Sequence, residues 1–389
     1  MSLWVIKDGK LAMVNSGKIE ELPDGIRAGY IRRTLEAAKR REWKTTGEGA
    51  KFTGTFAPDA AQMSSICANV SGIAEYGDAV YYAETIDSIS GIYKKTSADE
   101  AEGIATSTND FAFNGLDIFR HRAVTSFSSL GSHVAVADLP GFDFSEVTEG
   151  NTIESDPVWS RSEPDVIYFS SAGLPERNDA PSETILTPAA IMSAMTECPT
   201  ASRGPASLCR LDLKSGEFET ILEDDNFDFV KPYPAPDGSL YYIKRPYSQN
   251  TKKSGCLFDA LMLPVRLLKA LFGFLSFFSL KYSGTPLSQG NTKAKNQDAG
   301  KLFIEGNLID AERELKANSG EKAPGIIPKS WELHKRLPDG SDSVLKRGVL
   351  CYAVCAEKLV FSNGRYLLTA DDEIIAKGDG VTLIKEISD

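Results

Sequence analysis

One short pattern of apolar and polar positions recurs six times along the chain. Each copy has a strand-like run, a tight break of polar or glycine residues, and a second run rich in aromatic and β-branched residues. The six copies occupy residues 4–13, 73–82, 127–136, 157–169, 232–242 and 352–361. Runs bounded by turn residues in this way predict hairpins. A hairpin unit that recurs every 40–50 residues or so is typical of a β-propeller.

A second pair of strands follows each hairpin, as in residues 207–225, where Lys214, Ser215 and Gly216 form the turn. The predicted blades span residues 63–108, 109–153, 154–225, 226–347 and 348–379. A sixth blade would combine a strand near residues 381–388 with strands from the N-terminus, which closes the ring and removes an exposed sheet edge. We therefore expect an all-β chain, with residues 1–389 forming one six-bladed β-propeller domain.

Two long insertions interrupt the repeat, and both fall between the second and third strands of their blades. Residues 174–205 interrupt blade three and contain a helix start at Thr187 and Pro188. Residues 251–328 interrupt blade four. In a propeller such connections emerge on the face that also carries the connections between blades, and functional loops concentrate on rigid scaffolds of this kind. We expect these helical insertions to cap one face, over the mouth of the central channel.

The second insertion contains an almost wholly apolar segment, residues 256–281, which Pro264 should divide into a helical hairpin. Its second helix is about 24 Å long, too short for a bilayer core of about 30 Å. Residues 251–301 carry eight Lys or Arg against two Asp, a net +6. Three interpretations stay open: a packed core element, an interfacial helix on an anionic membrane surface, and a docking face for a protein. The contact residues of the last two would be Arg266, Lys269, Phe272, Phe274, Phe277 and Phe278.

Composition narrows the class of protein. Apolar residues make up 42% of the 389 residues, which suits a folded globule, and 389 residues exceed one compact core unless the fold is repetitive. The net charge of −11 argues against a nucleic-acid partner. Six scattered cysteines and three histidines do not form a metal-binding pattern. With no secretory signal at residues 1–10, we expect reduced thiols in a cytoplasmic protein that is membrane-peripheral if residues 256–281 bind lipid.

One stretch resembles a known repeat family. The motif Asp156-Pro157-Val158-Trp159-Ser160, followed by an apolar strand at residues 166–169, resembles the repeat of TolB-type, WD-like propellers. Residues 236–238 keep the Pro-Asp-Gly turn of that repeat, whereas residues 163–165 read Glu-Pro-Asp in its place. The resemblance covers about residues 154–247 and implies a six-bladed propeller of unknown function. It assigns no catalytic residue, and the chain has no GxSxG motif of the kind that peptidases with such propellers carry.

The candidate chemistry lies in acidic residues that precede the first strands of blades. No phosphate loop, HExxH motif or dinucleotide-binding glycine pattern is present. Asp156, Asn226 and Asp228 should approach the channel mouth, where they are the candidate ligand-binding residues. Converging carboxylates could hold Ca²⁺, as in lactonase-type propellers. The favoured interpretation is that such residues cap turns, their commonest role in loops, so we assign neither a metal site nor a catalytic residue.

These observations favour a non-enzymatic scaffold that recognises a protein or peptide on the capped face, with no cofactor. The preference rests on the absence of catalytic motifs and on analogy with other propellers. The alternative is a Ca²⁺-dependent, lactonase-like hydrolase with its site at the channel mouth. The sequence does not specify the ligand of either.

Overall fold

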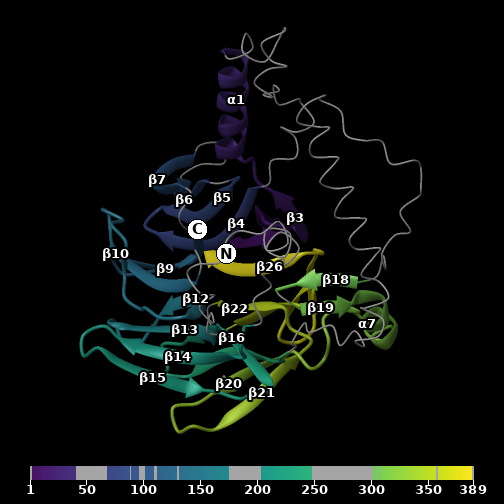
Figure 1. The fold of residues 1–389 in the computed structure, drawn as a ribbon. Helices are drawn as coiled ribbons and strands as arrows, with labels where there is room; N and C mark the ends of the chain where they lie inside the picture. Colours follow the sequence, from purple (N-terminus) through teal and green to yellow (C-terminus); the bar gives the residue numbers. More distant parts are fainter. Residues whose placement is uncertain are drawn as a thin grey trace, which may run out of the picture.

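The computed structural model describes residues 2–40, 68–174, 203–247 and 301–387, apart from gaps at 88, 96–100, 109–111, 129–130, 306 and 356–357. Within these residues the chain is mostly β, built from four-stranded antiparallel units. The units follow one another around the molecule, from β4–β7 through β12–β15 to β20 and β21 (Figure 1). The two ends of the chain lie close together in the same view. This arrangement is consistent with a β-propeller.

The first three units, in chain order, come from the N-terminal half of the chain. One contains β4 (Ala68–Tyr76), β5 (Ala79–Ile86), β6 (Ile89–Lys95) and β7 (Ala101–Thr108). The next contains β8 (Ala112–Phe119), β9 (Arg122–Ser128), β10 (Ser132–Asp138) and β11 (Ser145–Glu146). The third contains β12 (Thr152–Trp159), β13 (Val166–Gly173), β14 (Ala206–Asp212) and β15 (Glu217–Leu222). A single parallel bridge, Ser132 to Ile153, links the second and third units.

The remaining units come from the second half of the chain and from its two ends. One contains β16 (Phe227–Pro234), β17 (Leu240–Pro246), β20 (Glu332–Arg336) and β21 (Asp342–Arg347). Another contains β22 (Cys351–Cys355), β23 (Lys358–Ser362), β24 (Tyr366–Thr369) and β25 (Ile374–Lys377). The last contains β26 (Val381–Ile387), β1 (Ser2–Lys7), β2 (Lys10–Asn15) and β3 (Lys18–Glu21).

The pairing of β26 with β1 joins the two ends of the chain. The two strands run antiparallel, with Ser2 opposite Ile387 and Val5 opposite Ile384. The turn between β1 and β2 has left-handed residues at Asp8 and Gly9, the geometry that suits a two-residue hairpin. The sequence-based expectation that N- and C-terminal strands share one sheet is therefore confirmed.

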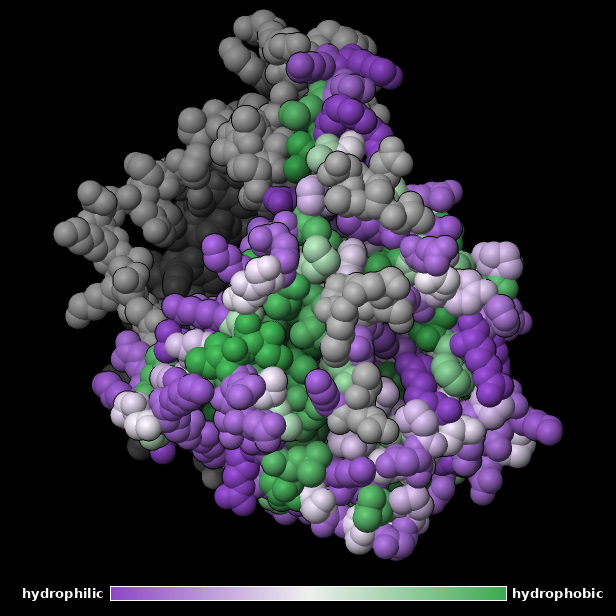
Figure 2. Space-filling view, turned by 180° about the vertical axis from the view of Figure 1, so that it is seen from behind, coloured by the Kyte–Doolittle hydropathy of each residue, from purple (hydrophilic) through white to green (hydrophobic). Residues whose placement is uncertain are grey.

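The second strand of a unit can be almost wholly buried, whereas outer strands are the more exposed. β5 is buried along nearly its whole length, whereas the outer strands β15 and β21 are largely exposed. These outer strands carry charged side chains such as Glu217, Glu219 and Lys346, which discourage edge-to-edge pairing with another molecule. Figure 2 shows the corresponding surface from behind: hydrophilic side chains surround the margin, and apolar side chains gather near the middle of this face.

Neighbouring units pack through apolar side chains. Between the units of β4 and β8, the Tyr81 ring stacks on Phe142 at 5.4 Å. Within the second unit, the rings of Phe113 and Phe127 meet edge to face at 5.3 Å. The backbones also approach closely, since a Cβ on Gly72 would lie 2.3 Å from the backbone nitrogen of Leu116. Any side chain at Gly72 would force these two strands apart.

Two helices lie among the described residues. α1 (Gly25–Arg40) extends away from the sheets (Figure 1) and ends with the basic residues Lys39 and Arg40. α7 (Ala311–Ala317) follows the hairpin of β18 (Lys301–Ile304) and β19 (Asn307–Asp310), and Asp310 caps it by accepting from the Arg313 amide. Neither of these helices is long and apolar enough to cross a membrane. The predicted helix at Thr187 and the apolar hairpin at residues 256–281 lie outside the described residues.

The pairing of β26 with β1 predicts that truncating a buried isoleucine of β26 destabilises the protein more than truncating an exposed isoleucine of β25. Ile384 on β26 is buried, so Ile384→Ala should lower the free energy of unfolding by about 2–4 kcal/mol through lost contacts and a cavity. Ile374→Ala is the matched control, because Ile374 on β25 is 43% exposed. Urea denaturation followed by circular dichroism measures both. Equal, small effects would contradict a structural role for β26 in the core.

A buried carboxyl group predicts a pH dependence. Glu84 on β5 is 2% exposed, and burial, together with nearby Asp24, raises its pKa from 4.5 to about 8. The folded state therefore holds a proton that the unfolded state loses above pH 4.5, and stability should fall as the pH rises from 4.5 to 8. Glu84→Gln should remove this slope and stabilise the protein at pH 8 by about 2–4 kcal/mol. Urea unfolding at pH 5 and pH 8 tests this, and an unchanged slope would contradict it.

Candidate functional site

A cavity of about 820 Å³ lies where the inner strands of the units meet. The cavity is lined by residues of the inner strand of every unit, namely β4, β8, β12, β16, β22 and β26. It therefore lies at the centre around which the sheets are arranged. Its volume falls in the range of about 300–1,000 Å³ typical of small-ligand sites. Two lining residues come from the interrupting segments: Arg203, which precedes β14, and Glu305, which follows β18. The cavity is therefore lined by both the repeat and its insertions.

Two inner strands present a charged residue to the cavity from the same repeat position. In β12 the pairing with β13 shifts between Ser155 and Val158, and in β16 the pairing with β17 shifts between Val230 and Tyr233. The extra residues of these two bulges are Asp156-Pro157 and Lys231-Pro232. A bulge residue leaves the strand ladder and can be aimed away from it, and proline is tolerated there because its missing N–H is not needed.

Asp156, Lys231 and Glu305 meet in the cavity although they lie far apart in the sequence. The Lys231 ammonium is 2.9 Å from Glu305 Oε1 and 4.0 Å from Asp156 Oδ1. All three residues have a left-handed backbone, with φ of 52°, 54° and 46° in sequence order. Such a conformation costs a non-glycine residue about 1–2 kcal/mol, and strained residues of this kind concentrate at functional sites.

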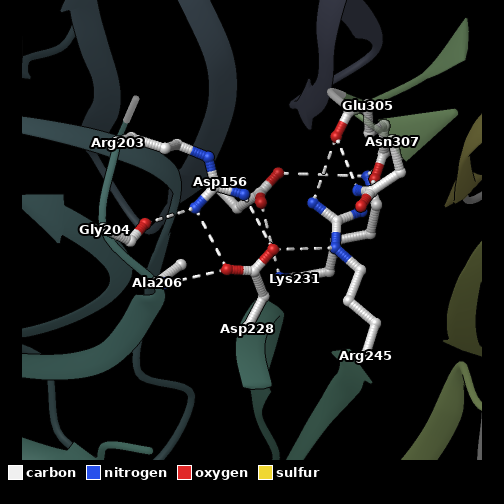
Figure 3. A network of polar contacts seen from close by, with 9 residues as sticks. All are labelled: Asp156, Arg203, Gly204, Ala206, Asp228, Lys231, Arg245, Glu305 and Asn307. Carbon is white, nitrogen blue, oxygen red and sulfur yellow. Dashed lines mark hydrogen bonds and ion pairs between the residues drawn. The ribbon is translucent and has the colours of Figure 1, made fainter. Parts of the chain in front are cut away.

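Asp228 lies beneath this group and is fully buried. Arg203 holds both of its carboxylate oxygens, at 3.0 and 2.7 Å, and the Ala206 amide donates to Oδ1 at 2.9 Å (Figure 3). Arg245 reaches the same carboxylate through Nε at 3.4 Å and donates to Glu305 Oε2 at 2.8 Å. Arg203 thus links the Asp228 carboxylate to the first insertion. Arg245 links the same carboxylate to Glu305 of the second insertion.

The charged forms of this cluster stabilise one another. Burial alone would raise the pKa of Glu305, but the attraction of Lys231 and Arg245 outweighs it and lowers the pKa below its usual range. Burial would lower the pKa of Lys231, but the carboxylates of Glu305 and Asp156 outweigh it and raise the pKa. Both groups therefore remain ionised at neutral pH.

A second buried carboxylate, Asp117 on β8, also has two cations. Arg161 and Lys385 approach its Oδ1 at 2.7 and 2.9 Å, and the Trp159 amide donates to Oδ2 at 3.0 Å. Burial would raise the pKa of Asp117, yet these two cations lower it to about 2. Lys385 belongs to β26, so this ion pair also connects the C-terminal strand to the second unit.

The structure brings two of the three sequence-predicted site residues together. Asp156 lines the cavity, and Asp228 belongs to the same polar network (Figure 3). Asn226 is exposed just before β16, where its carbonyl accepts from the Tyr247 amide. Asp156 and Asp228 lie within β12 and β16 rather than in loops before the strands, because these strands begin earlier than the sequence pattern indicated. Arg266, Lys269 and the four phenylalanines between 272 and 278 lie outside the described residues.

Sequence reasoning missed Lys231, Arg203, Arg245 and Glu305. The signal for Lys231 was present, since Lys231-Pro232 occupies the repeat position of Asp156-Pro157 with the opposite charge. The two arginines and the glutamate belong to no motif. Arg203 and Glu305 reach the cavity only because the insertions that carry them fold back against the sheets.

The described residues contain neither a group of metal ligands nor an activated thiol. Within the described ranges, no three His, Cys, Asp or Glu side chains are grouped so that they could hold a metal ion. Cys209, Cys351 and Cys355 are free and buried. Burial raises the pKa of Cys209 to about 11 and those of Cys351 and Cys355 to about 12, so these thiols are neutral at pH 7 and weakly nucleophilic. The described residues that line the cavity present fixed charges of both signs, from Asp156, Lys231 and Glu305.

Comparison with known proteins gives a likeness of fold only. No protein-family model and no curated protein sequence matches the chain. A chain in the crystal structure of the nidogen/laminin complex aligns with 8% identity and a TM-score of 0.45, covering 98% of this chain and 97% of that one. TolB from Acinetobacter baumannii aligns with 9% identity and a TM-score of 0.47, covering 98% of this chain and 66% of that one. The chain is thus similar in structure to β-propeller proteins, at low sequence identity.

Proposed function

We propose that this protein is a non-enzymatic binding scaffold: a closed six-bladed β-propeller, capped on one face by its insertions, that recognises a protein or peptide segment. The four-stranded units and the pairing of β26 with β1 support the closed ring. The positions of Arg203 and Glu305 support the cap, since both belong to the interrupting segments and both line the central cavity. Rigid sheets that carry binding groups on their connecting segments are a common scaffold for recognition.

The observation that carries the proposal is the meeting of Asp156, Lys231 and Glu305 in a cavity of ligand size. A peptide offers amide donors, carbonyl acceptors and charges of both signs, and the cavity wall presents fixed charges of both signs beside apolar residues such as Val230 and Leu383. Backbone strain at all three charged residues indicates that their positions are maintained at a cost in stability. Fixed polar groups in an apolar wall are the usual source of orientation and specificity in a binding site.

The alternative is a Ca²⁺-dependent hydrolase that uses Asp156 and Asp228. Both oxygens of Asp228 face arginine side chains, which would repel a divalent cation. No other observation within the described residues favours this alternative. Metal analysis of the purified protein separates the two functions: stoichiometric Ca²⁺ that is lost in an Asp156→Ala/Asp228→Ala variant would support the hydrolase.

Selection of peptides from a displayed random library tests the binding function. The wild-type protein should enrich a peptide family, and Asp156→Ala/Lys231→Ala should weaken binding of the selected peptides by about tenfold or more, equivalent to about 1.4 kcal/mol. The matched control is Lys346→Ala/Asp372→Ala, which removes a 2.9 Å ion pair of the same charges from the outer surface. Calorimetric titration measures both. Failure to enrich any peptide, or equal binding by the cavity variant and the control, would contradict the proposal.

A further inference from the structure

We infer that the cavity is a carboxylate-recognition site, and that Glu305 occupies the position of the ligand's carboxylate in this structure. The inference rests on the proposed binding function and adds the chemistry of the ligand to it. Lys231 and Arg245 are the two cations that would bind the ligand's carboxylate, and we call them the receptor. In this structure they bind the carboxylate of Glu305, which follows β18 in the same chain.

The two cations hold the Glu305 carboxylate as they would hold a free one. Lys231 Nζ lies 2.9 Å from Oε1, and an Arg245 guanidinium nitrogen lies 2.8 Å from Oε2, so each oxygen has its own cation. Charge-assisted contacts of this length are the strong class of hydrogen bond. The carboxylate also lines the open cavity, so a ligand in the cavity can approach the same two cations.

The receptor is positioned by groups other than Glu305. The Arg245 guanidinium lies 4.7 Å from the centre of the Trp331 ring and bonds Asp228 through Nε. The Lys231 ammonium also donates to the Thr382 carbonyl of β26 at 3.4 Å, and the Lys231 carbonyl accepts from the Tyr352 hydroxyl at 2.7 Å. Both cations would therefore keep their positions when Glu305 leaves, which is what a preformed site requires.

Glu305 itself belongs to an insertion and has a strained backbone. Its φ of 46° lies in the left-handed region, at the end of β18. The base of the hairpin is anchored separately, because Ile309 is buried in a cluster with Ile327, Trp331 and Leu350. Withdrawal of the tip alone would release the strain at Glu305 while the base of the hairpin stays packed.

The charge balance favours an anionic replacement. Around Asp228 and Lys231 there are three cations, Arg203, Lys231 and Arg245, and three carboxylates, Asp156, Asp228 and Glu305. Removal of Glu305 leaves three cations against two carboxylates, a net +1 in a largely buried place. An uncompensated buried charge is costly, so a ligand carboxylate is the natural replacement. In a peptide this carboxylate is either the C-terminus or an acidic side chain.

Rescue of a Glu305 variant by a small carboxylate tests the site directly. Glu305→Ala should melt at a lower temperature than the wild type, and propionate should raise its melting temperature by about 2 °C or more through selective binding to the folded state. Propionamide and chloride should not do so. Glu321→Ala is the matched control, since Glu321 is an exposed residue of the same insertion, paired with Lys329. Glu305→Gln is the isosteric second variant if Glu305→Ala does not fold.

Three short peptides distinguish the sources of the carboxylate. They are acetyl-Gly-Gln-Gly with a free C-terminus, acetyl-Gly-Glu-Gly amide, and acetyl-Gly-Gln-Gly amide, which has no carboxylate. At least one of the first two should bind Glu305→Gln about tenfold or more tightly than it binds the wild type, because the tethered competitor is gone. The neutral peptide should show no such gain, and adding Lys231→Met to Glu305→Gln should abolish it.

The outcomes separate this inference from the proposed function. If neither propionate nor either carboxylate peptide favours the Glu305 variants over the wild type, the carboxylate site is wrong, even when library peptides bind. If propionate rescues Glu305→Ala but the library yields no peptide, the carboxylate site stands and peptide recognition is wrong.

Discussion

The pairing of β26 with β1 is the constraint on which the rest of the structure depends. It makes the last strand of the chain the inner strand of a unit whose other strands come from the beginning, so the sheets surround the cavity only when both ends are in place. β26 also supplies Lys385 to buried Asp117 and the Thr382 carbonyl to Lys231. The same strand therefore joins the two ends of the chain in one sheet and completes two polar contacts of the cavity wall.

Charge compensation explains the composition of the cavity. Two carboxylates are buried at the cavity, Asp117 in its wall and Asp228 behind it, and each is held by two cations. A buried carboxylate that lost these partners would be strongly destabilising. Three of these four cations, Arg203, Arg245 and Lys385, also line the cavity. Under the proposed binding function the same side chains serve folding and recognition, so we expect site variants to show effects on both.

The sequence predicted the repeat well and the site only in part. The recurring hairpins, the turns and the shared terminal sheet follow from apolar periodicity and turn residues, which are local signals. Asp156 and Asp228 were identified because both are acidic residues that precede a predicted first strand. Glu305 and Arg203 could not be found in this way, because their partners are distant in the sequence and only the return path of each insertion brings them to the cavity. Asn226 failed to join the site because β16 begins after it, leaving it in an exposed turn.

The bulge in the inner strands has a consequence for how such a protein can change over evolutionary time. Gly115, Asp156 and Lys231 occupy equivalent bulges of β8, β12 and β16, outside the regular strand ladder. A substitution there replaces neither an apolar core side chain nor a residue paired in the strand ladder, so it changes the cavity wall while the ladder stays intact. Three blades with glycine, aspartate and lysine at this one position show that neutral, acidic and basic groups are all accepted. Under the proposed binding function, replacing this one residue in a unit would change which ligand charge the cavity favours without altering the strand pairing around it.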